Sequence, residues 1–389
     1  MANRLIDTRD PLRGAAPANF EWASRLLAKA DVQIDGTRPW DLRIHHPETL
    51  TRILRQGSLG LGESYMDGWW DCRQLDGLMA RVLTARLDED VVHPGMLWAT
   101  LKAQLFNLQS VSRAWHVARK HYDIDNELYR NMLDPTLAYS CGYWAKASTL
   151  DDAQRDKLEL ICRKLGLQHG MRLLDIGCGF GSLMRHAAEY HGVHCVGLTI
   201  SSNQAALGKH LCEGLPISFE LIDYRDFNRD GRDKFDRIAS VGMFEHVGPR
   251  NYVNYFEVVR RSLREKGLFL LHTIGRGSTS TGVDPWIEKY IFPNAVLPSM
   301  TQIAAACEPK FVVEDWHNFG ADYDRTLLAW HLRFEAAWPQ LQRKHDERFR
   351  RMWRYYLLTC AGSFRARTNQ LWQLVLSPRG VIAGYRCPR

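Results

Sequence analysis

The sequence of 389 residues has no long apolar run, and no stretch approaches the roughly 18 residues that a membrane-spanning helix needs. Its first residues, Met-Ala-Asn-Arg-Leu-Ile-Asp, contain an early acid and no apolar core, so no secretion signal is recognised. Its nine cysteines include no Cys-x-x-Cys pair, which disfavours a zinc ribbon or a disulfide framework. Internal repeats and low-complexity tracts are also missing. Any membrane contact should therefore be peripheral, the scattered thiols suit a reducing cytosol, and no metal site is predicted.

The composition is that of an ordinary globular protein. Apolar residues make up 45% and charged residues 24% of the chain, and the length allows two or three domains. The formal net charge of +7 is a mild basic excess. It suits an anionic partner such as a membrane surface, and it is equally compatible with no partner. Nucleic-acid modification would need a stronger basic groove and base-reading motifs, so we expect no nucleic-acid partner.

Residues 1–90 predict a small N-terminal α+β domain. Short strands are expected at 32–34 and 42–44, and a helix at 47–55 that ends before Gly57. Glycines and aromatic residues crowd into 59–71, which indicates a compact turn or a ligand-facing loop, or else aromatic side chains that fill a small core. We expect this domain to contact lipid.

Residues 91–126 predict a basic amphipathic connector between domains. Residues 91–122 contain no acid, and they carry Lys102, Arg113, Arg119 and Lys120 among apolar and aromatic side chains. This pattern is typical of a helix that lies on anionic lipid. Packing between two domains would produce a similar pattern, so both interpretations stay open.

Residues 127–389 alternate between strand and helix patterns. A helix is expected at 151–165 and another at 251–263, and a helical aromatic stretch covers 326–366. Strands are expected at 171–176, 193–198, 217–222, 235–243, 267–274, 311–316 and 371–376. Repeated strand–helix units predict an α/β domain with a mostly parallel sheet that is covered on both faces. Ligands of such sheets bind beyond the carboxyl ends of the strands.

A glycine-rich turn follows the first of these strands. Residues 175–181 read Asp-Ile-Gly-Cys-Gly-Phe-Gly, and a helix pattern begins at once. Glycines let backbone amides approach a ligand, and the helix N-terminus adds positive potential. The turn lacks the two-residue gap of the dinucleotide fingerprint, which favours S-adenosylmethionine. A tight turn without a ligand is the alternative.

The ends of the next strands supply further candidates. Thr199 and Gln204 stand where related methyltransferases usually place an acid for the ribose, and Asp223 and Tyr224 are suited to accept from and stack on an adenine. The cofactor-binding candidates are Tyr139, Ser140, Asp175, Gly177, Gly179, Gly181, Thr199, Gln204, Asp223, Tyr224 and Arg225.

Glu245 and His272 lie at the carboxyl ends of adjacent predicted strands, where a substrate would lie. Each also has a simpler interpretation. Glu245 is suited to cap the helix that follows, His272 is suited to be a satisfied core histidine, and Cys141 is suited to be a small buried filler. Their predicted convergence favours a catalytic role.

The chain closely resembles the cyclopropane fatty acid synthases over its whole length. The segments that carry the resemblance are 138–141 (Ala-Tyr-Ser-Cys), 174–179, 197–201, 241–248 (Val-Gly-Met-Phe-Glu-His-Val-Gly), 284–293, 314–320 (Glu-Asp-Trp-His-Asn-Phe-Gly) and 360–365. The glycine turn is common to many methyltransferases, whereas 241–248 and 314–320 are far more specific.

The resemblance implies a Rossmann-like class I methyltransferase fold in residues 127–389, with a seven-stranded sheet. It also implies transfer of a one-carbon unit from S-adenosylmethionine to a cis double bond of a phospholipid acyl chain, followed by ring closure. The alternative is a related enzyme that leaves a methyl branch without closing a ring. A homodimer in the cytoplasm, peripherally bound to the inner face of the membrane, would follow from the same resemblance.

The same resemblance implies how the proton is removed. A bound bicarbonate would act as the base, held by residues matching Cys141, Glu245, His272 and Tyr323. Cys360 matches a cysteine suspected as a nucleophile, but this mechanism needs no covalent thiol, so we interpret Cys360 as pocket lining. Aromatic faces stabilise cations, and the candidates for this role are Tyr143, Trp144, Phe244 and Tyr323.

Overall fold

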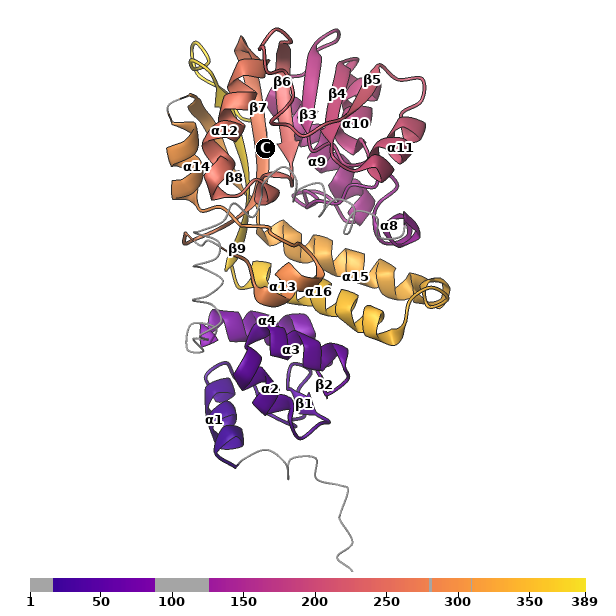
Figure 1. Cartoon of the computed structure of the whole chain (residues 1–389), viewed down its shortest axis with the longest axis vertical. Helices are drawn as coiled ribbons and strands as arrows, with labels where there is room; N and C mark the ends of the chain where they lie inside the picture. The colour runs from indigo at the N-terminus through magenta and orange to yellow at the C-terminus, as the bar shows by residue number, and fades with distance from the viewer. Residues whose placement is uncertain (1–16, 88–125, 280–281, 309) are drawn as a thin grey trace, which may run out of the picture.

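The computed structural model describes residues 17–87, 126–279, 282–308 and 310–389. A sheet with its helices forms one end of the molecule, the long helices α15 (Ala321–Leu341) and α16 (Glu347–Arg365) lie in the middle, and the N-terminal helices form the other end (Figure 1). The connector predicted at 91–126, with its four cations, lies outside the described residues apart from Asn126.

The sheet has seven strands in the order β5-β4-β3-β6-β7-β9-β8. Neighbouring strands from β5 to β7 run parallel, and β9 runs antiparallel to both β7 and β8. This arrangement confirms the seven predicted strands and the mostly parallel Rossmann-like fold. The strands are β3 (Arg172–Ile176), β4 (His194–Thr199), β5 (Ile217–Leu221), β6 (Phe235–Val241), β7 (Leu263–Arg276), β8 (Val312–Asn318) and β9 (Asn369–Ser377).

Helices cover both faces of the sheet because its strands are apolar on both sides. Adjacent residues Leu173 and Leu174 are both fully buried, and they belong to two separate apolar clusters. The cluster around Leu173 includes α9 (Leu150–Leu165) and α10 (Ser182–His191), and the cluster around Leu174 includes α12 (Tyr252–Ser262) and α14 (Met300–Cys307). Helix α11 (Ser202–Leu211) connects β4 to β5.

The N-terminal unit is mainly helical. Its elements are α1 (Pro17–Ala28), β1 (Arg43–Ile44), α2 (Thr49–Gln56), α3 (Ser58–Met66), β2 (Trp70–Asp71) and α4 (Leu75–Thr84). The compact turn predicted from residue 59 onward is wrong up to Met66, because those residues form α3. Tyr65 and Trp70 are buried, so the core interpretation of these aromatic side chains is confirmed.

The core of the N-terminal unit continues into α15 and α16, since one apolar cluster includes residues from Ala23 to Phe364. A Cβ atom on Gly362 of α16 would lie only 2.6 Å from the backbone oxygen of Asp76 in α4. Arg351 of α16 also donates to the backbone oxygens of Tyr65 and Trp70. The N-terminal unit therefore shares its core with two helices from the far end of the chain.

A buried carboxylate joins the N-terminal unit to α13 (Pro285–Tyr290). Glu63 of α3 accepts hydrogen bonds from Lys289 at 2.6 Å and from the Tyr290 hydroxyl at 2.9 Å. Arg52 of α2 pairs with the other oxygen of the same carboxylate at 2.8 Å. Helix α8 (Asn126–Met132) packs against α15.

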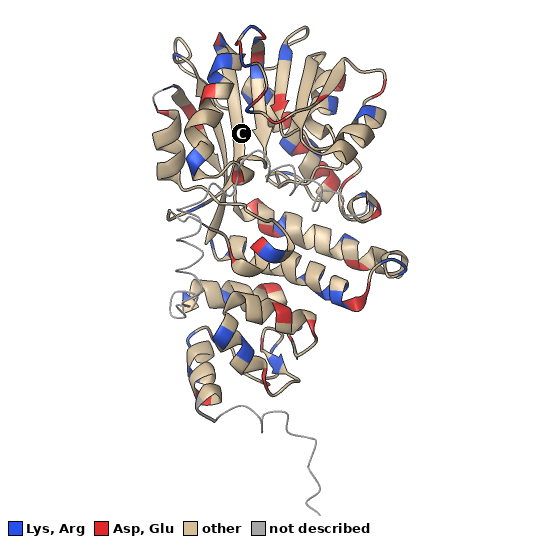
Figure 2. Cartoon of the chain, in the orientation of Figure 1, with Lys and Arg blue, Asp and Glu red and all other residues tan. Residues whose placement is uncertain are grey.

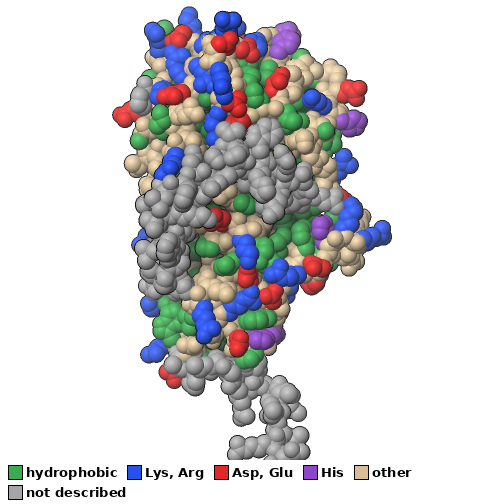
Figure 3. Space-filling model, in the orientation of Figure 1, with side chains coloured by type: hydrophobic (Ala, Val, Ile, Leu, Met, Phe, Trp, Pro, Cys, Tyr) green, Lys and Arg blue, Asp and Glu red, His purple; other side chains and the backbone are tan. Residues whose placement is uncertain are grey.

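Acidic and basic side chains are interspersed over the described elements (Figure 2) and over the face drawn in space-filling form (Figure 3). The described part of that face therefore presents no large surface of one sign. Among the helices that the structure describes, none is both long enough and apolar enough to span a bilayer.

Candidate active site

A cavity of about 520 Å³ opens at the carboxyl ends of the parallel strands. The chain runs from β3 outward to β4 and β5, then crosses to β6 on the other side of β3, so the order of strands reverses between β3 and β6. Open α/β sheets bind ligands at such a reversal. Helices α15 and α16 lie below these strand ends in Figure 1, and they close the cavity from the other side.

The predicted glycine turn forms part of the cavity wall. The amides of Gly177 and Cys178 both donate to the Leu198 oxygen of β4, and Gly177, Gly179 and Gly181 all have positive φ. A Cβ on Gly177 would lie 2.6 Å from the Met243 side chain, whereas a Cβ on Gly179 would meet nothing within 4 Å. Gly179 therefore leaves space beside the start of α10 that a bound ligand can fill.

Asp175, the second-last residue of β3, places a buried carboxyl group in the cavity wall. Its Oδ1 has no hydrogen-bond partner within the described part of the chain. Burial raises its pKa to about 7, and the nearby Lys157 ammonium opposes this shift. An unpartnered buried oxygen is the kind of group that a polar ligand satisfies.

Lys157 is a cavity residue that the sequence reasoning missed. Its Nζ, buried on α9, donates to Ser140 Oγ at 2.9 Å, and burial lowers its pKa to about 8. Gln154, one turn earlier, donates to the backbone oxygens of Ala138 and Ser140. Helix α9 thus holds the segment that carries Tyr139, Ser140 and Cys141. Lys157 shares a helical face with Gln154 and the apolar Ile161, and this spacing is the sequence signal that could have identified it as buried.

Thr199 and Gln204 line the cavity and interact with each other. The Thr199 hydroxyl lies 3.3 Å from Gln204 Oε1 and also accepts from the Ser201 amide. Asp223 and Arg225 form a closed pair, because Nε donates to one carboxylate oxygen at 2.8 Å and a terminal nitrogen donates to the other at 2.6 Å. Asp223 Oδ1 also accepts from the Arg225 backbone amide, so both carboxylate oxygens already accept hydrogen bonds from Arg225 in this structure.

Tyr224 also lines the cavity, but most of its ring is buried against Tyr255 at 5.4 Å in an edge-on arrangement. Arg225 lies over the Tyr224 ring at 5.5 Å. Stacking of Tyr224 on an adenine stays a prediction.

Glu245 is a second buried carboxyl group in the cavity wall. It follows β6, whereas Asp175 lies on β3, so the two carboxyl groups lie on either side of the strand reversal. Glu245 lies in the short 3-10 helix Phe244–His246 after β6, and its Oε1 accepts from the Ile274 amide at 2.6 Å. Its Oε2 is buried without a partner in the described structure, and burial raises its pKa to about 7. Glu245 can therefore carry a proton near neutral pH and donate it to a bound anion.

His272 lies beside Val241 on the next strand, β7, but it is not among the described residues that line the cavity. Its Nδ1 lies 3.1 Å from Gln373 Nε2 of β9, and its Nε2 is buried without a partner in the described structure. Burial lowers its pKa well below the usual range, so the imidazole is neutral. Gln373, which orients this ring, was not predicted to belong to the site.

Tyr323 of α15 lies close to several other candidate residues, namely Cys141, Tyr139, Glu245 and Cys360. Its ring stacks on Phe364 at 4.5 Å. Burial raises its pKa well above the usual range, and the nearby groups Cys141, Tyr139 and Glu245 raise it further. Tyr323 and Tyr139 both line the cavity, and the Tyr139 hydroxyl lies 2.8 Å from that of Tyr356.

The two cysteine candidates differ in position. Cys141 is fully buried beside Thr326, 3.7 Å from its hydroxyl, and does not line the cavity within the described structure. Cys360 of α16 does line it, and burial raises the pKa of its thiol to about 12. Cys360 is therefore a neutral thiol at physiological pH, in agreement with its interpretation as pocket lining.

Of the four aromatic candidates for stabilising a cation, Tyr323 alone lines the cavity as the structure describes it. Phe244 stacks on Tyr252 in the core, and the Trp144 indole donates to the Thr326 hydroxyl, which also lies beside Cys141. The prediction was wrong for Tyr143, Trp144 and Phe244, because sequence proximity to a motif does not fix which way a ring points. Among the described residues, the aromatic lining comes from Tyr139, Phe180, Tyr224, Trp286, Phe292, Tyr323, Tyr355, Tyr356 and Phe364.

The N-terminal unit contributes apolar side chains to the same cavity. Leu61 of α3 and Met79 and Leu83 of α4 lie in its wall together with Trp286 and Ile287 of α13. The cavity thus combines polar groups from the strand ends with an apolar wall from helices that the sequence reasoning had not connected to the site.

Comparison with known proteins agrees with this geometry. The sequence pattern of the family described as "Mycolic acid cyclopropane synthetase" matches residues 109–374. The "Cyclopropane-fatty-acyl-phospholipid synthase" of Escherichia coli strain K12 is 55% identical over 373 residues, which cover 95% of this chain and 96% of that protein. Two solved structures also match: the cyclopropane synthase MmaA2 from Mycobacterium tuberculosis, with a TM-score of 0.63, and the mycolic acid cyclopropane synthase CmaA1 complexed with SAH and CTAB, with a TM-score of 0.62. Each is 31% identical, and each comparison covers 67% of this chain and 97% of the other.

Proposed function

Because the chain belongs to the mycolic acid cyclopropane synthetase family, we propose that it is an S-adenosylmethionine-dependent enzyme that cyclopropanates lipids, and that its substrates are cis-unsaturated acyl chains of membrane phospholipids. The observation that carries this proposal is the cavity at the strand ends, in which unpartnered carboxyl oxygens of Asp175 and Glu245 meet an apolar wall. The E. coli phospholipid synthase is similar over 95% of the chain, including the N-terminal unit that supplies part of this wall.

The residues present fit S-adenosylmethionine. The space beside Gly179 and the unpartnered Oδ1 of Asp175 are suited to its polar end, and Thr199 and Asp223 lie on the same wall. When bound, S-adenosylmethionine supplies an electrophilic methyl group on a sulfonium. Lys157 keeps the wall in place by holding Ser140 through its hydroxyl.

The apolar wall orients the acyl chain and excludes water. An alkene is a weak nucleophile, so the reaction depends on alignment and on a dry site. Methylation of the double bond leaves a carbocation on the acyl chain, and loss of a proton from the new methyl carbon closes the ring. The ring face of Tyr323 is suited to stabilise that positive charge.

The residues also fit a bicarbonate ion, whose chemistry would be to accept the proton. The unpartnered Oε2 of Glu245 supports this assignment, because a protonated carboxyl can donate to an anion where an ionised one would repel it. Tyr323 can donate from its hydroxyl. The unpartnered Nε2 of His272 and the thiol of Cys141 lie behind the described lining, so we assign them a supporting role in holding the site.

Incubation with unsaturated phospholipid vesicles and S-adenosylmethionine tests the function. Mass spectrometry should show a gain of one CH2 per double bond. Ring closure and methyl branching add the same mass, so proton NMR is needed to distinguish them, and it should show loss of the alkene signals. Cyclopropane signals would support the proposal. A gain of CH2 with retained alkene signals would indicate the methyl-branching alternative, and unchanged lipid would contradict the proposal.

We also propose that the enzyme works at the anionic inner surface of the membrane as a homodimer. The net charge of +7 and the acid-free stretch at 91–122 support the first part. Replacing Lys102, Arg113, Arg119 and Lys120 by Gln should weaken binding to anionic vesicles and reduce its salt sensitivity in sedimentation assays. Unchanged binding would assign the stretch to packing between domains.

The proposed homodimer is tested by analytical ultracentrifugation, in which the sedimenting mass should be twice that of one chain.

A further inference from the structure

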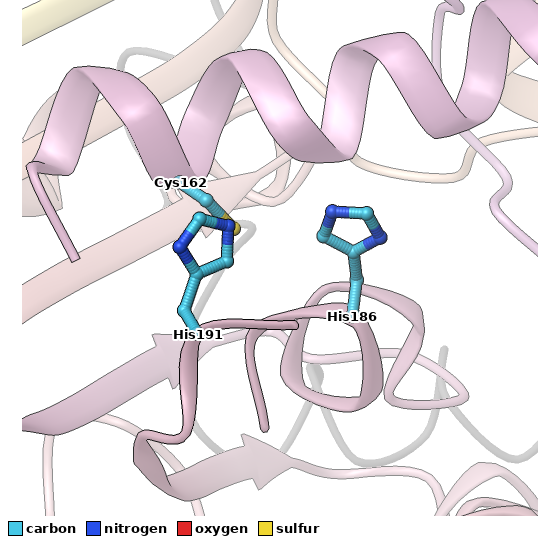
Figure 4. A group of neighbouring side chains, drawn as sticks. All are labelled: Cys162, His186 and His191. Atoms are coloured by element: carbon cyan, nitrogen blue, oxygen red, sulfur yellow. The ribbon is translucent and has the colours of Figure 1, made fainter. Parts of the chain in front are cut away.

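A group of metal-ligating side chains lies outside the cavity, between α9 and α10. Cys162 and Glu159 stand one turn apart on α9, and His186 and His191 lie on α10, which packs against α9. In Figure 4 both imidazoles extend toward the helix that carries Cys162, and that of His191 lies beside the Cys162 side chain. None of these four side chains is among the described residues that line the cavity.

The distances within this group are close to those of a metal site. The ligand atoms of Cys162, His186 and His191 all lie within 4.8 Å of one another. One carboxylate oxygen of Glu159 lies 3.1 Å from His186 Nε2 and 3.0 Å from His191 Nε2. Ligands bound about 2.0 to 2.3 Å from a tetrahedral zinc ion are about 3.3 to 3.8 Å apart, so the three ligand atoms would approach one another by up to about 1 Å to bind one.

We propose that Cys162, His186 and His191 bind a zinc ion, with water as the fourth ligand. Thiolate and imidazole are both common zinc ligands, and the Glu159 carboxylate beside the two histidines offsets the positive charge that the thiolate leaves on the ion. Binding releases the Cys162 proton to solvent and leaves a thiolate on the metal, so the step needs no redox partner. Both imidazoles bind in their neutral form.

A simple ion pair explains only part of this arrangement. Glu159 bridging two histidines accounts for three side chains, but it gives no reason for a thiol buried beside them. Cys162 is fully buried, whereas the Glu159 side chain is 40% exposed and that of His191 is 19% exposed. The group is therefore open to solvent on its carboxylate side and closed on its sulfur side, which gives a cation a route of entry.

A bound metal would join the two helices that position the cofactor wall. Helix α9 holds the segment 138–140 through Gln154 and Lys157, and α10 begins directly after the glycine turn. Zinc would fix these helices to each other at a point away from the reacting groups. We therefore expect a stabilising metal, not a catalytic one.

Cobalt titration of the full-length, chelator-treated protein tests the site. One equivalent of Co²⁺ should bind per chain with a thiolate-to-cobalt charge-transfer band, and Zn²⁺ should displace it. H191Q and C162A should each lose this band and the rise in thermal midpoint that Zn²⁺ produces in the unchanged protein. His210 is exposed on α11 and Cys307 is buried on α14, so H210Q and C307A are matched controls that should retain both signals.

The partly exposed His191 keeps the test valid even if C162A fails to fold. Absence of a stoichiometric band in the unchanged protein would overturn the proposal. Retention of the band in H191Q, or its loss in H210Q or C307A, would also overturn it. These readouts do not depend on lipid turnover, so they remain informative if the proposed function fails.

Discussion

Replacement of Glu245 by Gln should separate stability from turnover. The carboxyl is buried, its Oε1 accepts from the Ile274 amide, and its pKa is raised from 4.5 to about 7. At about 1.4 kcal/mol per pKa unit, keeping this group ionised costs the folded protein about 3 kcal/mol at pH 8. A glutamine keeps an oxygen for Ile274 and never ionises, so E245Q should be more stable than the unchanged protein at that pH.

The sign of the effect depends on pH in a defined way. Between pH 4.5 and about 7 the unfolded carboxyl loses its proton while the folded one keeps it, so stability falls as the pH rises through this range. Below pH 4.5 both forms are protonated, and the advantage of E245Q should disappear. Thermal midpoints of both proteins at pH 4 and pH 8 measure the difference, and E220Q, which replaces an exposed glutamate on β5, is the control that should show none.

Turnover should change in the opposite direction. A residue that exchanges a proton with the base contributes about 10²–10⁴-fold to rate, so E245Q should lose activity by that order while its Kd for S-adenosylmethionine stays close to that of the unchanged protein. Two results would refute the reasoning: cyclopropanation by E245Q at the original rate, or a stability gain that is the same at pH 4 and pH 8.

Three further substitutions test the walls of the cavity. K157M removes the donor to Ser140 and the cation beside Asp175, so the Kd for S-adenosylmethionine in calorimetry should rise about tenfold or more, with partial recovery in K157R; an unchanged Kd would contradict the positioning role. C360A should retain most activity because the thiol is protonated at neutral pH, and a loss as severe as that of E245Q would restore the nucleophile interpretation. G362A places a Cβ 2.6 Å from the Asp76 oxygen and should cost about 1 to 3 kcal/mol of stability in thermal denaturation, whereas G282A, with nothing within 4 Å, is the matched control that should cost far less.

The sheet could be predicted from the sequence because each of its strands is a short apolar run bounded by turns. Consecutive apolar residues such as Leu173 and Leu174, both fully buried in the structure, predict a strand from the local sequence alone, and the glycine turn at 177–181 marks where that strand ends. The predicted ends were less accurate where tertiary pairing extends a strand. β7 begins at Leu263, four residues before the predicted start at Gly267, because it pairs with β6 from Phe235 onward.

The site could be predicted only in part, because motifs identify residues but not the directions of their side chains. Glu245, Tyr323 and Cys360 line the cavity as expected, while Cys141 and His272 lie behind its described lining. Lys157 was missed because a lysine in an amphipathic helix usually lies in solvent. The apolar wall was missed because it depends on contacts between α3, α4, α13 and α16, which no local pattern encodes.

The shared core of the N-terminal unit has a consequence for synthesis on the ribosome. Arg351 bonds to the Trp70 oxygen across 281 residues of chain, and the apolar cluster that begins at Ala23 is completed only by α16. At about 5 to 20 residues per second, the helices α1–α4 would emerge roughly 15 to 60 seconds before their partners. During that interval part of their apolar surface has no native partner, so the nascent chain offers a binding site to chaperones until residue 365 has left the exit tunnel.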